Sequence, residues 1–353
     1  MRICFLGSFT GGGTESACFK IANELVKVHT IFILSTSKIK NSFYLNEKIQ
    51  FSNIVNDSLI GKNIEVSYFL IKEKIDVLVT LEAMAGIFSI FPALVTGCKH
   101  IIWEHANYYQ NQGGKYIQKI RQIELKLTNA YVVLTKRDLK NFQIHFRSKA
   151  YLTYIYNIAP PQTDNPYNLE SKVIISVGHI RKIKNFIVIP DIAQRVFEKH
   201  SDWCWKIYGT MKGEEYEKLK LKIRKYGLQD KIIFMGRCEN MNVEYQKASI
   251  YVMTSLQEGL PMVLLEAKSN KLPLVSFDIE TGPSEIIQDG INGYLIPPYE
   301  ISTMAESISR LIDNKELRKK FSDNAKLDLD KFETTTIIDH WNKLIESIGT
   351  KKI

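Results

Sequence analysis

The feature that most constrains the fold is an alternation of short apolar runs with amphipathic stretches, which occurs twice along the chain. In the first half it predicts strands at residues 3–6, 30–34, 77–81, 99–104 and 130–134. In the second half it predicts strands at residues 173–177, 203–208, 232–235, 250–253, 274–277 and 293–296, with helices such as 214–226 and 302–313 between them. Alternation of this kind forms parallel sheets with right-handed crossovers, so we expect an α/β fold of two Rossmann-like domains.

A proline-rich polar stretch at residues 159–166 separates the two series and is the natural linker. The length also favours two domains, because 353 residues exceed the ~250 at which a single core usually stops growing. We therefore predict an N-terminal domain of residues 1–163 and a C-terminal domain of residues 164–334, facing each other across a cleft.

Composition and charge narrow the classes of protein. The five cysteines are too scattered for a disulfide framework or a zinc cluster, which favours a reducing cytosol. The apolar run at residues 83–95 is shorter than the ~20 residues that a membrane span needs. Nearly all of the net charge of +9 lies in the first half, where residues 1–163 hold 19 Lys and Arg against 11 Asp and Glu, a net +8. Residues 115–149 are especially basic and would attract anionic lipid or a diphosphate-bearing acceptor, unless they form a solvated helix face. They contain no recognised nucleic-acid-binding module, so no nucleic-acid partner is predicted.

Ligands of open parallel sheets bind beyond the carboxyl ends of the strands, and two such loops stand out in the first half. The first strand leads into a loop with Gly12 and Gly13, followed by a helix predicted to begin near Thr14, whose free amides and dipole suit a phosphate. A simple chain reversal is the alternative. His105 follows the strand at 99–104 and could hydrogen-bond a sugar hydroxyl or stabilise developing charge, unless it is a structural histidine.

The loops of the second half carry charge. Arg181 and Lys184 follow the strand at 173–177 and suit neutralisation of a leaving diphosphate, although exposed lysines in loops often have no function. After the strand at 250–253, Glu258 could accept hydrogen bonds from sugar hydroxyls, and Glu266 could accept them from ribose hydroxyls.

A helix is predicted between these two glutamates. Pro261 is placed in its first turn, so the unpaired amides near Gly259 and Leu260 would bind an anion. For Glu258 alone, the alternative is a carboxylate favoured by the helix dipole.

A Glu, seven residues and a second Glu in this context resemble glycosyltransferase family 4, which has the GT-B fold. The similarity extends over essentially the whole chain, through the glycine loop, His105, the lysine segment, and the loops at residues 277–287 and 289–293. Family members commonly carry an arginine directly after the glycine that ends the strand at 173–177. This chain has His179 there, and Arg181 is the candidate for the arginine's role.

The resemblance implies a retaining, metal-independent hexosyltransferase that needs no cofactor besides its UDP-sugar donor. It implies that Glu258 contacts the donor hexose, that Arg181 and Lys184 stabilise the departing diphosphate, and that uracil lies near Arg237. It further implies that a final helix, residues 335–348, packs Trp341 on the first domain.

The downstream loops are similar to the subgroup that builds bacterial surface polysaccharides, such as O-antigen of lipopolysaccharide, capsule or exopolysaccharide. The donors of that subgroup are UDP-galactose, UDP-N-acetylgalactosamine or UDP-N-acetylglucosamine. A polyprenyl-diphosphate-linked saccharide is the expected acceptor, with a cytoplasmic protein held peripherally on the inner face of the membrane.

Three alternatives stay open. A metal-dependent transferase would need an Asp-x-Asp motif at a strand end, whereas the match Asp328-Leu329-Asp330 lies in a polar, helical-looking segment. A sugar-nucleotide epimerase would keep the fold and change the reaction. A non-enzymatic protein would use the basic half to bind a membrane or nucleic acid.

Overall fold

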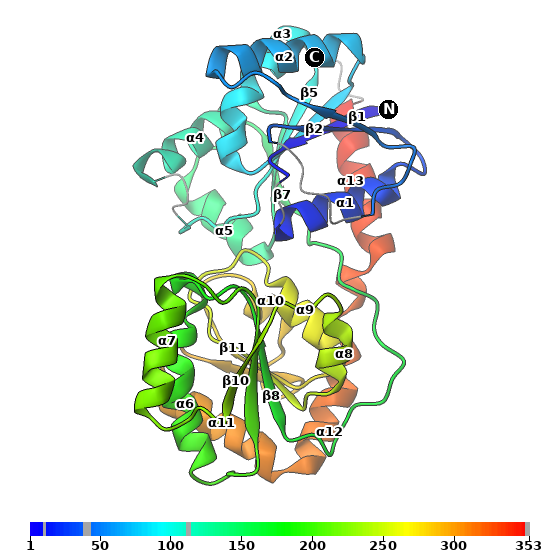
Figure 1. Cartoon of the computed structure of the whole chain (residues 1–353). Coiled ribbons are helices and arrows are strands. Elements are labelled where there is room, and N and C mark those ends of the chain that lie inside the picture. The colour runs from blue at the N-terminus through cyan, green and yellow to red at the C-terminus, as the bar shows by residue number, and fades with distance from the viewer. Residues whose placement is uncertain (10–11, 38–43, 111–113, 350–353) are drawn as a thin grey trace. The chain divides into compact units, whose positions relative to one another are not determined.

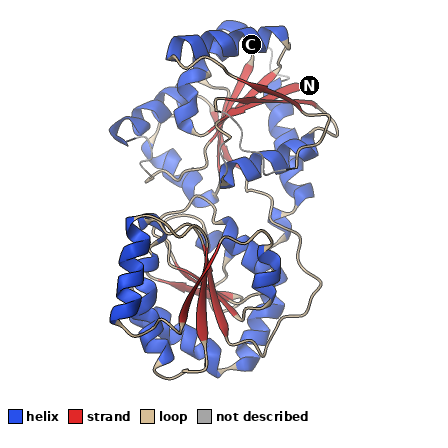
Figure 2. Ribbon diagram, in the orientation of Figure 1, coloured by secondary structure: helices blue, strands red, loops and turns tan. Residues whose placement is uncertain are grey.

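The computed structural model describes residues 1–9, 12–37, 44–110 and 114–349, so Thr10 and Gly11 of the predicted glycine loop lie outside the described residues. The chain forms two compact units, each a parallel sheet with helices on both faces (Figures 1 and 2). Unit 1 contains Met1–Ile158 and Lys331–Ile353, and unit 2 contains Ala159–Asp330. The chain thus passes to unit 2 after residue 158 rather than 163, and returns to unit 1 at residue 331 rather than 335.

The sheet of unit 1 has the order β3-β2-β1-β4-β5-β6-β7, and neighbouring strands are parallel throughout the described residues. Its strands are β1 (Arg2–Gly7), β2 (Thr30–Ser35), β3 (Gln50–Asn53), β4 (Val77–Leu81), β5 (Lys99–Trp103), β6 (Ala130–Val133) and β7 (Tyr151–Tyr154). Interior strands such as β4 are buried along their whole length, because helices cover both faces, and they therefore form continuous apolar runs.

The edge strands β3 and β7 were not predicted. β3 has the sequence QFSN and is exposed at both ends, and no residue of β7 is fully buried. Neither edge strand therefore has the buried β-branched run that identifies interior strands.

Helices of unit 1 begin and end where local chemistry satisfies their terminal groups. The Ser58 side chain accepts a hydrogen bond from the Gly61 amide at the start of α2, Thr135 does the same for Asp138 in α5, and α3 ends at Gly97 with φ +71°. The helices are α1 (Gly13–Leu25), α2 (Leu59–Lys72), α3 (Ile90–Thr96), α4 (Ile117–Leu127), α5 (Lys136–His145) and α13 (Thr334–Gly349), with the 3₁₀ turns η1 (Ala83–Phe88), η2 (Gly114–Tyr116) and η6 (Asp330–Phe332).

The C-terminal helix α13 packs in unit 1. Its Trp341 side chain is fully buried and lies edge-on to Trp103 of β5, with ring centroids 4.9 Å apart. Trp103 and Trp341 are among the largest fully buried side chains of the chain, so α13 is part of the core of unit 1.

The sheet of unit 2 has the order β10-β9-β8-β11-β12-β13, again parallel. Its strands are β8 (Val173–Val177), β9 (Cys204–Tyr208), β10 (Ile232–Gly236), β11 (Ile250–Met253), β12 (Leu274–Phe277) and β13 (Gly293–Ile296). Its helices are α6 (Ile189–Phe197), α7 (Glu214–Lys225), α8 (Met241–Gln246), α9 (Met262–Ser269), α10 (Pro283–Ile286), α11 (Ile301–Asp313) and α12 (Lys315–Asp323), with the turns η3 (Lys182–Lys184), η4 (Phe186–Val188) and η5 (Asn324–Lys326). Every strand predicted in either half occurs, and the largest difference at any strand boundary is one residue.

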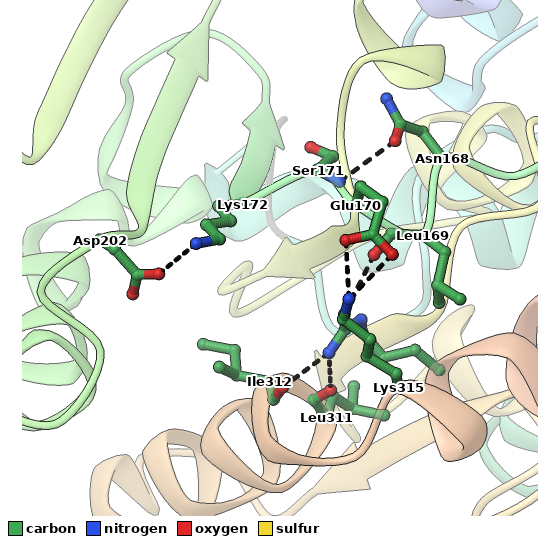
Figure 3. Close-up of polar contacts among 10 residues, drawn as sticks. Asn168, Leu169, Glu170, Ser171, Lys172, Asp202, Leu311, Ile312 and Lys315 are labelled. Carbon is green, nitrogen blue, oxygen red and sulfur yellow. Dashed lines mark hydrogen bonds and ion pairs between the residues drawn. The ribbon is translucent and has the colours of Figure 1, made fainter.

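Polar contacts tie the segment that enters β8 to α12 and to the loop before β9, and they tie α12 to α11 (Figure 3). Lys315 binds Glu170 at 2.6 Å, Lys172 binds Asp202 at 2.5 Å, and the buried Arg318 donates to the carbonyl of Leu311 at 2.6 Å. These contacts lie at the amino ends of the strands, so the opposite edge of the sheet is available for ligands.

Candidate functional site

The strand order reverses once in each sheet, between β1 and β4 in unit 1 and between β8 and β11 in unit 2. Ligands of open α/β sheets bind beyond the carboxyl ends of the strands at such a point. In unit 2 the loops after β8 and β11 carry Lys184 and Glu258. In unit 1 the glycine loop follows β1, Glu82 follows β4, and His105 follows the next strand, β5.

An ion pair joins the two switch-point loops of unit 2. Lys184 Nζ lies 2.6 Å from Glu258 Oε1, and both side chains are partly buried. The Thr254 hydroxyl donates to the carbonyl of Lys184 at 3.0 Å, and the Leu256 amide donates to the carbonyl of Ile183 at 2.8 Å. Residues 74 positions apart in sequence therefore form one rigid corner of the site.

Backbone conformation brings a third loop to this corner. Asn185 is buried in the left-handed conformation with φ +54°, which asparagine tolerates and which turns the chain between η3 and η4. Gly209, directly after β9, has φ +139°, and a Cβ there would lie 2.0 Å from the carbonyl oxygen of Gly178. Glycine at residue 209 is therefore required for the loop after β9 to approach the loop after β8.

A group of cations surrounds His179. Partial burial lowers the pKa of His179, and the charges of Arg181, Arg237, Lys184 and Lys212 lower it further. Arg237 follows β10, and its Nε donates to the Thr210 hydroxyl at 2.9 Å. Because the pKa lies below its ordinary value of 6.5, His179 is neutral at pH 7, and the positive charge comes from the arginines and lysines.

The segment from Glu258 to Glu266 differs from its prediction in one respect. The helix α9 begins at Met262, and Pro261 is its N-cap with ψ 97°, so the proline precedes the first turn instead of lying in it. The amides of Gly259 and Leu260 make no hydrogen bond within the described residues. Unpaired amides directly before a helix are the donors that an anion uses.

The loop after β12 supports this segment. The Thr281 hydroxyl donates to the carbonyl of Glu258 at 2.5 Å. Gly282 has φ +103°, and a Cβ there would lie 2.4 Å from Pro261 Cδ, so a side chain at residue 282 would displace the proline.

Glu266 lies on α9 and is held by a residue from another helix. The Tyr245 hydroxyl donates to Glu266 Oε2 at 3.0 Å, and the Tyr245 ring is fully buried. The carboxylate is itself only partly buried. A fixed, partly accessible carboxylate suits a pair of adjacent hydroxyl groups.

At the switch point of unit 1, a hydrogen bond joins the loops after β1 and β4. The Thr14 hydroxyl donates to Glu82 Oε1 at 2.9 Å. Glu82 has φ +67°, which is uncommon for a residue with a side chain, and its amide donates to the carbonyl of Trp103 at 2.9 Å. Burial raises the pKa of Glu82, although the bond from Thr14 lowers it, and the charge of Glu104 raises it further.

The glycine loop lies beside Thr14. Gly12 is the extended N-cap of α1, and Gly13 is its first residue. Both are exposed, and a Cβ at either would meet nothing within 4 Å. The described fold therefore does not itself require glycine at these positions, and the open space leaves room for the close approach of a ligand that the sequence predicts.

His105 lies in a half-buried position beside an aromatic ring. Its ring lies 4.5 Å from the ring of Trp103, and burial lowers its pKa to about 3, so the imidazole is neutral at pH 7. Its Nε2 atom is buried and has no hydrogen-bond partner among the described residues. The residue as a whole is half-buried, and a neutral imidazole can donate a hydrogen bond through one ring nitrogen and accept one through the other.

A buried network fixes the loop that carries His105. Arg121 of α4 binds Glu104 at 3.1 Å, and it donates to the carbonyls of Tyr108 at 2.9 Å and Asn107 at 3.2 Å. Asp138 of α5 accepts the Tyr108 amide at 2.9 Å. Basic residues of the segment 115–149 thus include a buried structural arginine as well as surface lysines.

Three residues of the candidate site were missed by sequence reasoning. Glu82 directly follows the strand predicted at 77–81, so its place at a strand end could have indicated it. Tyr245 and Thr281 bind Glu266 and Glu258 through the tertiary fold, and no local pattern identifies them.

Comparisons with known proteins find glycosyltransferases among the relatives of this chain. Residues 162–328 match the family model of glycosyl transferases group 1. An uncharacterized glycosyltransferase of Haemophilus influenzae is 29% identical over 95% of this chain and 97% of its own length. A Campylobacter jejuni α-1,4-N-acetyl-D-galactosaminyltransferase, named for the acceptor GalNAc-α-(1→4)-GalNAc-α-(1→3)-diNAcBac-PP-undecaprenol, is 24% identical over 99% of both chains.

The fold has solved counterparts. The structure of Staphylococcus aureus TarM with UDP, α-GlcNAc-glycerol and fondaparinux superimposes with a TM-score of 0.82 at 16% identity, covering 98% of this chain and 100% of that chain.

Proposed function

Because the chain belongs to the GT-B glycosyltransferases, the class that its sequence predicts, we propose that it transfers a hexose or N-acetylhexosamine from a UDP-sugar to a saccharide acceptor, retaining the anomeric configuration without a metal ion. The observation that carries the proposal is the meeting of Lys184 and Glu258 at the switch point of unit 2. A cation for a leaving diphosphate and a carboxylate for sugar hydroxyls lie side by side there.

The donor would be bound by unit 2. Its diphosphate would lie among Arg181, Lys184 and Arg237, with the free amides of Gly259 and Leu260 as further donors. Binding of the diphosphate to Lys184 would release Glu258 to accept from the hexose, while Glu266 would accept from the ribose.

Metal independence is supported by the source of positive charge. The cations around His179 would supply the neutralisation that a divalent ion supplies in metal-dependent transferases. The Asp328-Leu329-Asp330 segment runs from the turn after η5 into the first residue of η6 and does not follow a strand. Asp328 accepts a hydrogen bond from Gln288.

The acceptor would be bound by unit 1. Neutral His105 would hydrogen-bond the acceptor hydroxyl. Glu82 would bind a neighbouring hydroxyl, and the hydrogen bond from Thr14 would hold its carboxylate in position. The exposed Gly12 and Gly13 would allow either substrate to approach the backbone.

A polyprenyl-diphosphate-linked saccharide is the proposed acceptor, in the synthesis of a bacterial surface polysaccharide. The Campylobacter jejuni relative is named for an acceptor of that class, and an amylovoran biosynthesis glycosyltransferase of Erwinia amylovora is 30% identical over 65% of both chains. None of the helices in the described ranges is both long and apolar enough to cross a bilayer. We propose peripheral attachment to the inner face of the cytoplasmic membrane.

Donor turnover tests the proposal. In the presence of EDTA, the purified protein should hydrolyse one or more UDP-sugars or transfer their sugar to an acceptor, and it should not use GDP-sugars. NMR of the product should show that the sugar keeps the anomeric configuration of the donor. Glu258→Gln should abolish turnover, whereas Glu239→Gln, at an exposed carboxylate, should not.

Three outcomes would contradict this function. They are epimerisation of the UDP-sugar in the absence of acceptor, a requirement for divalent metal, and full activity of Glu258→Gln.

A further inference from the structure

His179 lies at the carboxyl edge of the unit 2 sheet, where backbone hydrogen bonds continue past the ends of β8 and β9. The Gly178 amide donates to the carbonyl of Tyr208 at 2.9 Å, and the Ile180 amide donates to the carbonyl of Thr210 at 3.3 Å. Both neighbours of His179 are therefore fixed to β9 and the loop that follows it. The histidine itself is exposed, at the edge of the sheet where ligands of open α/β folds bind.

The loop after β10 is tied to the same place. Arg237 Nε donates to the Thr210 hydroxyl at 2.9 Å, and the Thr210 carbonyl accepts the Ile180 amide. A single threonine thus links Arg237 to the residue beside His179. Hydrogen bonds of the fold therefore hold the Arg237 side chain near the loop that carries the histidine.

Four cations from three loops act on His179. They are Arg181 and Lys184 after β8, Lys212 after β9, and Arg237 after β10. Partial burial is the largest cause of the lowered pKa of His179, and repulsion by the four cations lowers it further. The cluster therefore opposes a further positive charge at residue 179.

The carboxylates near this edge do not balance the cations. Glu258 keeps its charge when it binds Lys184 at 2.6 Å, so four cations and one carboxylate leave a net charge of +3. The start of α7 adds Glu214 and Glu215, which lie 2.7 and 3.1 Å from Lys218, and these three residues contribute a further −1. The edge as a whole stays positive and suits an anionic ligand.

A permanent charge at residue 179 would repel these cations in the absence of a ligand. A histidine avoids the repulsion, because its side chain can stay neutral until an anion arrives. A diphosphate group brings several negative charges, and an opposite charge within about 4–6 Å raises the pKa of a basic group by roughly 1–3. The ligand that the four cations attract therefore also attracts a proton to His179.

We propose that His179 takes up a proton when a diphosphate group binds among these cations, so that the edge gains a positive charge only while the ligand is present. The proton comes from solvent and adds to the unprotonated ring nitrogen, and no bond of the ligand is made or broken. The consequence for a UDP-sugar donor rests on the proposed function, whereas proton uptake with a diphosphate does not.

The affinity for a diphosphate should fall as the pH rises. Below the pKa of His179 in the free protein, the imidazole is already charged, and the affinity is highest. Above the pKa of His179 in the complex, the imidazole is neutral with or without ligand, and the affinity is lowest. The lower limit of this window lies below 6.5, because burial and the cations lower the pKa of His179 in the free protein.

NMR measures the uptake of the proton at His179 directly. The imidazole C–H resonances of the full chain are followed from about pH 5 to 9 with and without saturating UDP, and the His179 resonance is the one that His179→Gln lacks. UDP should raise the pKa of His179 by about 1 or more, as expected for a nearby opposite charge. His200, before β9, and His340, on α13 of unit 1, are internal controls whose pKa should not change.

Calorimetry measures the consequence for affinity. Proton uptake with UDP, determined between pH 5.5 and 8.5 in buffers of different ionisation enthalpy, should be larger for the wild type than for His179→Gln, by about half a proton at its maximum. The ratio of wild-type to variant affinity should fall roughly fivefold or more over the same range. Titration of the UDP phosphates affects both proteins equally and cancels in these comparisons. Since residue 179 is exposed, the variant should fold, as circular dichroism will check.

A second variant tests the cation cluster. Arg237→Gln removes one repelling charge, so it should raise the pKa of His179 in the absence of UDP. Lys225→Gln, at an exposed lysine in the last turn of α7, is the matched control and should leave that pKa unchanged. A pKa of His179 that UDP leaves unchanged would overturn the proposal, and so would equal proton uptake by the wild type and His179→Gln.

The proposed function fails separately. If UDP binds and the pKa of His179 stays the same, the donor site stands and the proposed proton uptake fails. If UDP does not bind, the donor site fails, and inorganic pyrophosphate tests proton uptake alone. A higher pKa of His179 with pyrophosphate would then support the proposal, and an unchanged pKa would overturn it.

Discussion

The two switch-point edges have the same topology and opposite chemistry. In unit 2, arginine and lysine side chains gather around the loop after β8, and one carboxylate pairs with Lys184. In unit 1, the loops after β4 and β5 carry Glu82 and a neutral His105, and the arginine nearby is buried in an ion pair with Glu104. The difference shows that the fold supplies the place for a ligand, while loop side chains decide that unit 2 suits a diphosphate and unit 1 suits hydroxyl groups.

The edges also differ in how their charges are stabilised. The cations Arg181 and Arg237 are exposed, so water stabilises them and a ligand can replace that water. The charges behind His105 are buried, and they persist because Arg121 and the backbone satisfy them. Substitutions in the buried network behind His105 should therefore alter stability, whereas substitutions of the exposed cations of unit 2 should alter catalysis.

The largest expected effect is on the stability of unit 1. Burial raises the pKa of Asp138 to about 7 from an ordinary 3.8, so the folded chain keeps a proton that the unfolded chain loses. The contribution of Asp138 to wild-type stability should therefore fall as pH rises from 4 to 7. Asp138→Asn cannot ionise and can still accept the Tyr108 amide, so it should match the wild type near pH 4 and exceed it at pH 8 by up to about 4 kcal/mol, at ~1.4 kcal/mol per pKa unit.

Urea denaturation at pH 4, 6 and 8 measures this difference. Asp57→Asn, at an exposed carboxylate, is the control and should show no such trend. A stability difference between Asp138→Asn and the wild type that stays constant with pH would contradict a buried, protonated Asp138.

The second prediction concerns the cations of unit 2. Lys184→Met removes the cation proposed to bind the leaving diphosphate and leaves Glu258 without that partner. The value of kcat/KM for the UDP-sugar should therefore fall about 10²–10³-fold. Lys182→Met, at an exposed lysine of the same turn, should change it less than twofold. Equal losses in the two variants would mean that general positive charge, rather than the Lys184 position, is what matters.

The third prediction tests unit 1 as the acceptor side. Glu82→Gln keeps the size of the side chain and removes its charge, so the acceptor KM should rise about tenfold, the range of a hydrogen bond to a charged group. The affinity for UDP, measured by calorimetry, should not change, and Glu47→Gln at an exposed residue should have no effect. A change in UDP affinity alone would place Glu82 on the donor side and break the comparison.

The smallest expected effect concerns the support of Glu266. Tyr245→Phe removes the hydrogen bond to Glu266 Oε2 and should weaken UDP binding about fivefold, corresponding to ~1 kcal/mol, with little change in kcat. Tyr216→Phe on α7 is the control. Unchanged UDP affinity of Tyr245→Phe would show that Glu266 needs no positioning or does not contact the nucleoside.

Interior strands could be predicted from the sequence because helices cover both of their faces. Their residues therefore form an uninterrupted apolar run that a local reading of the sequence detects. The edge strands β3 and β7 could not, since each is stabilised mainly by its pairing with β2 or β6. The predicted start of α9 was also wrong, because a proline is compatible with the N-cap as well as with the first turn. In the structure Pro261 is the N-cap and packs against Gly282 of another loop, a contact that the local sequence does not contain.

The sequence by itself determined the two α/β units, the interior strands and the loops that carry the candidate residues, because those features follow from local periodicity and from turn chemistry. The tertiary structure alone decided that Lys184 meets Glu258 across 74 residues, that Thr14 holds Glu82, and that His105 is neutral. Distances between loops and the burial that shifts a pKa depend on which strands become neighbours, and no local pattern contains that information.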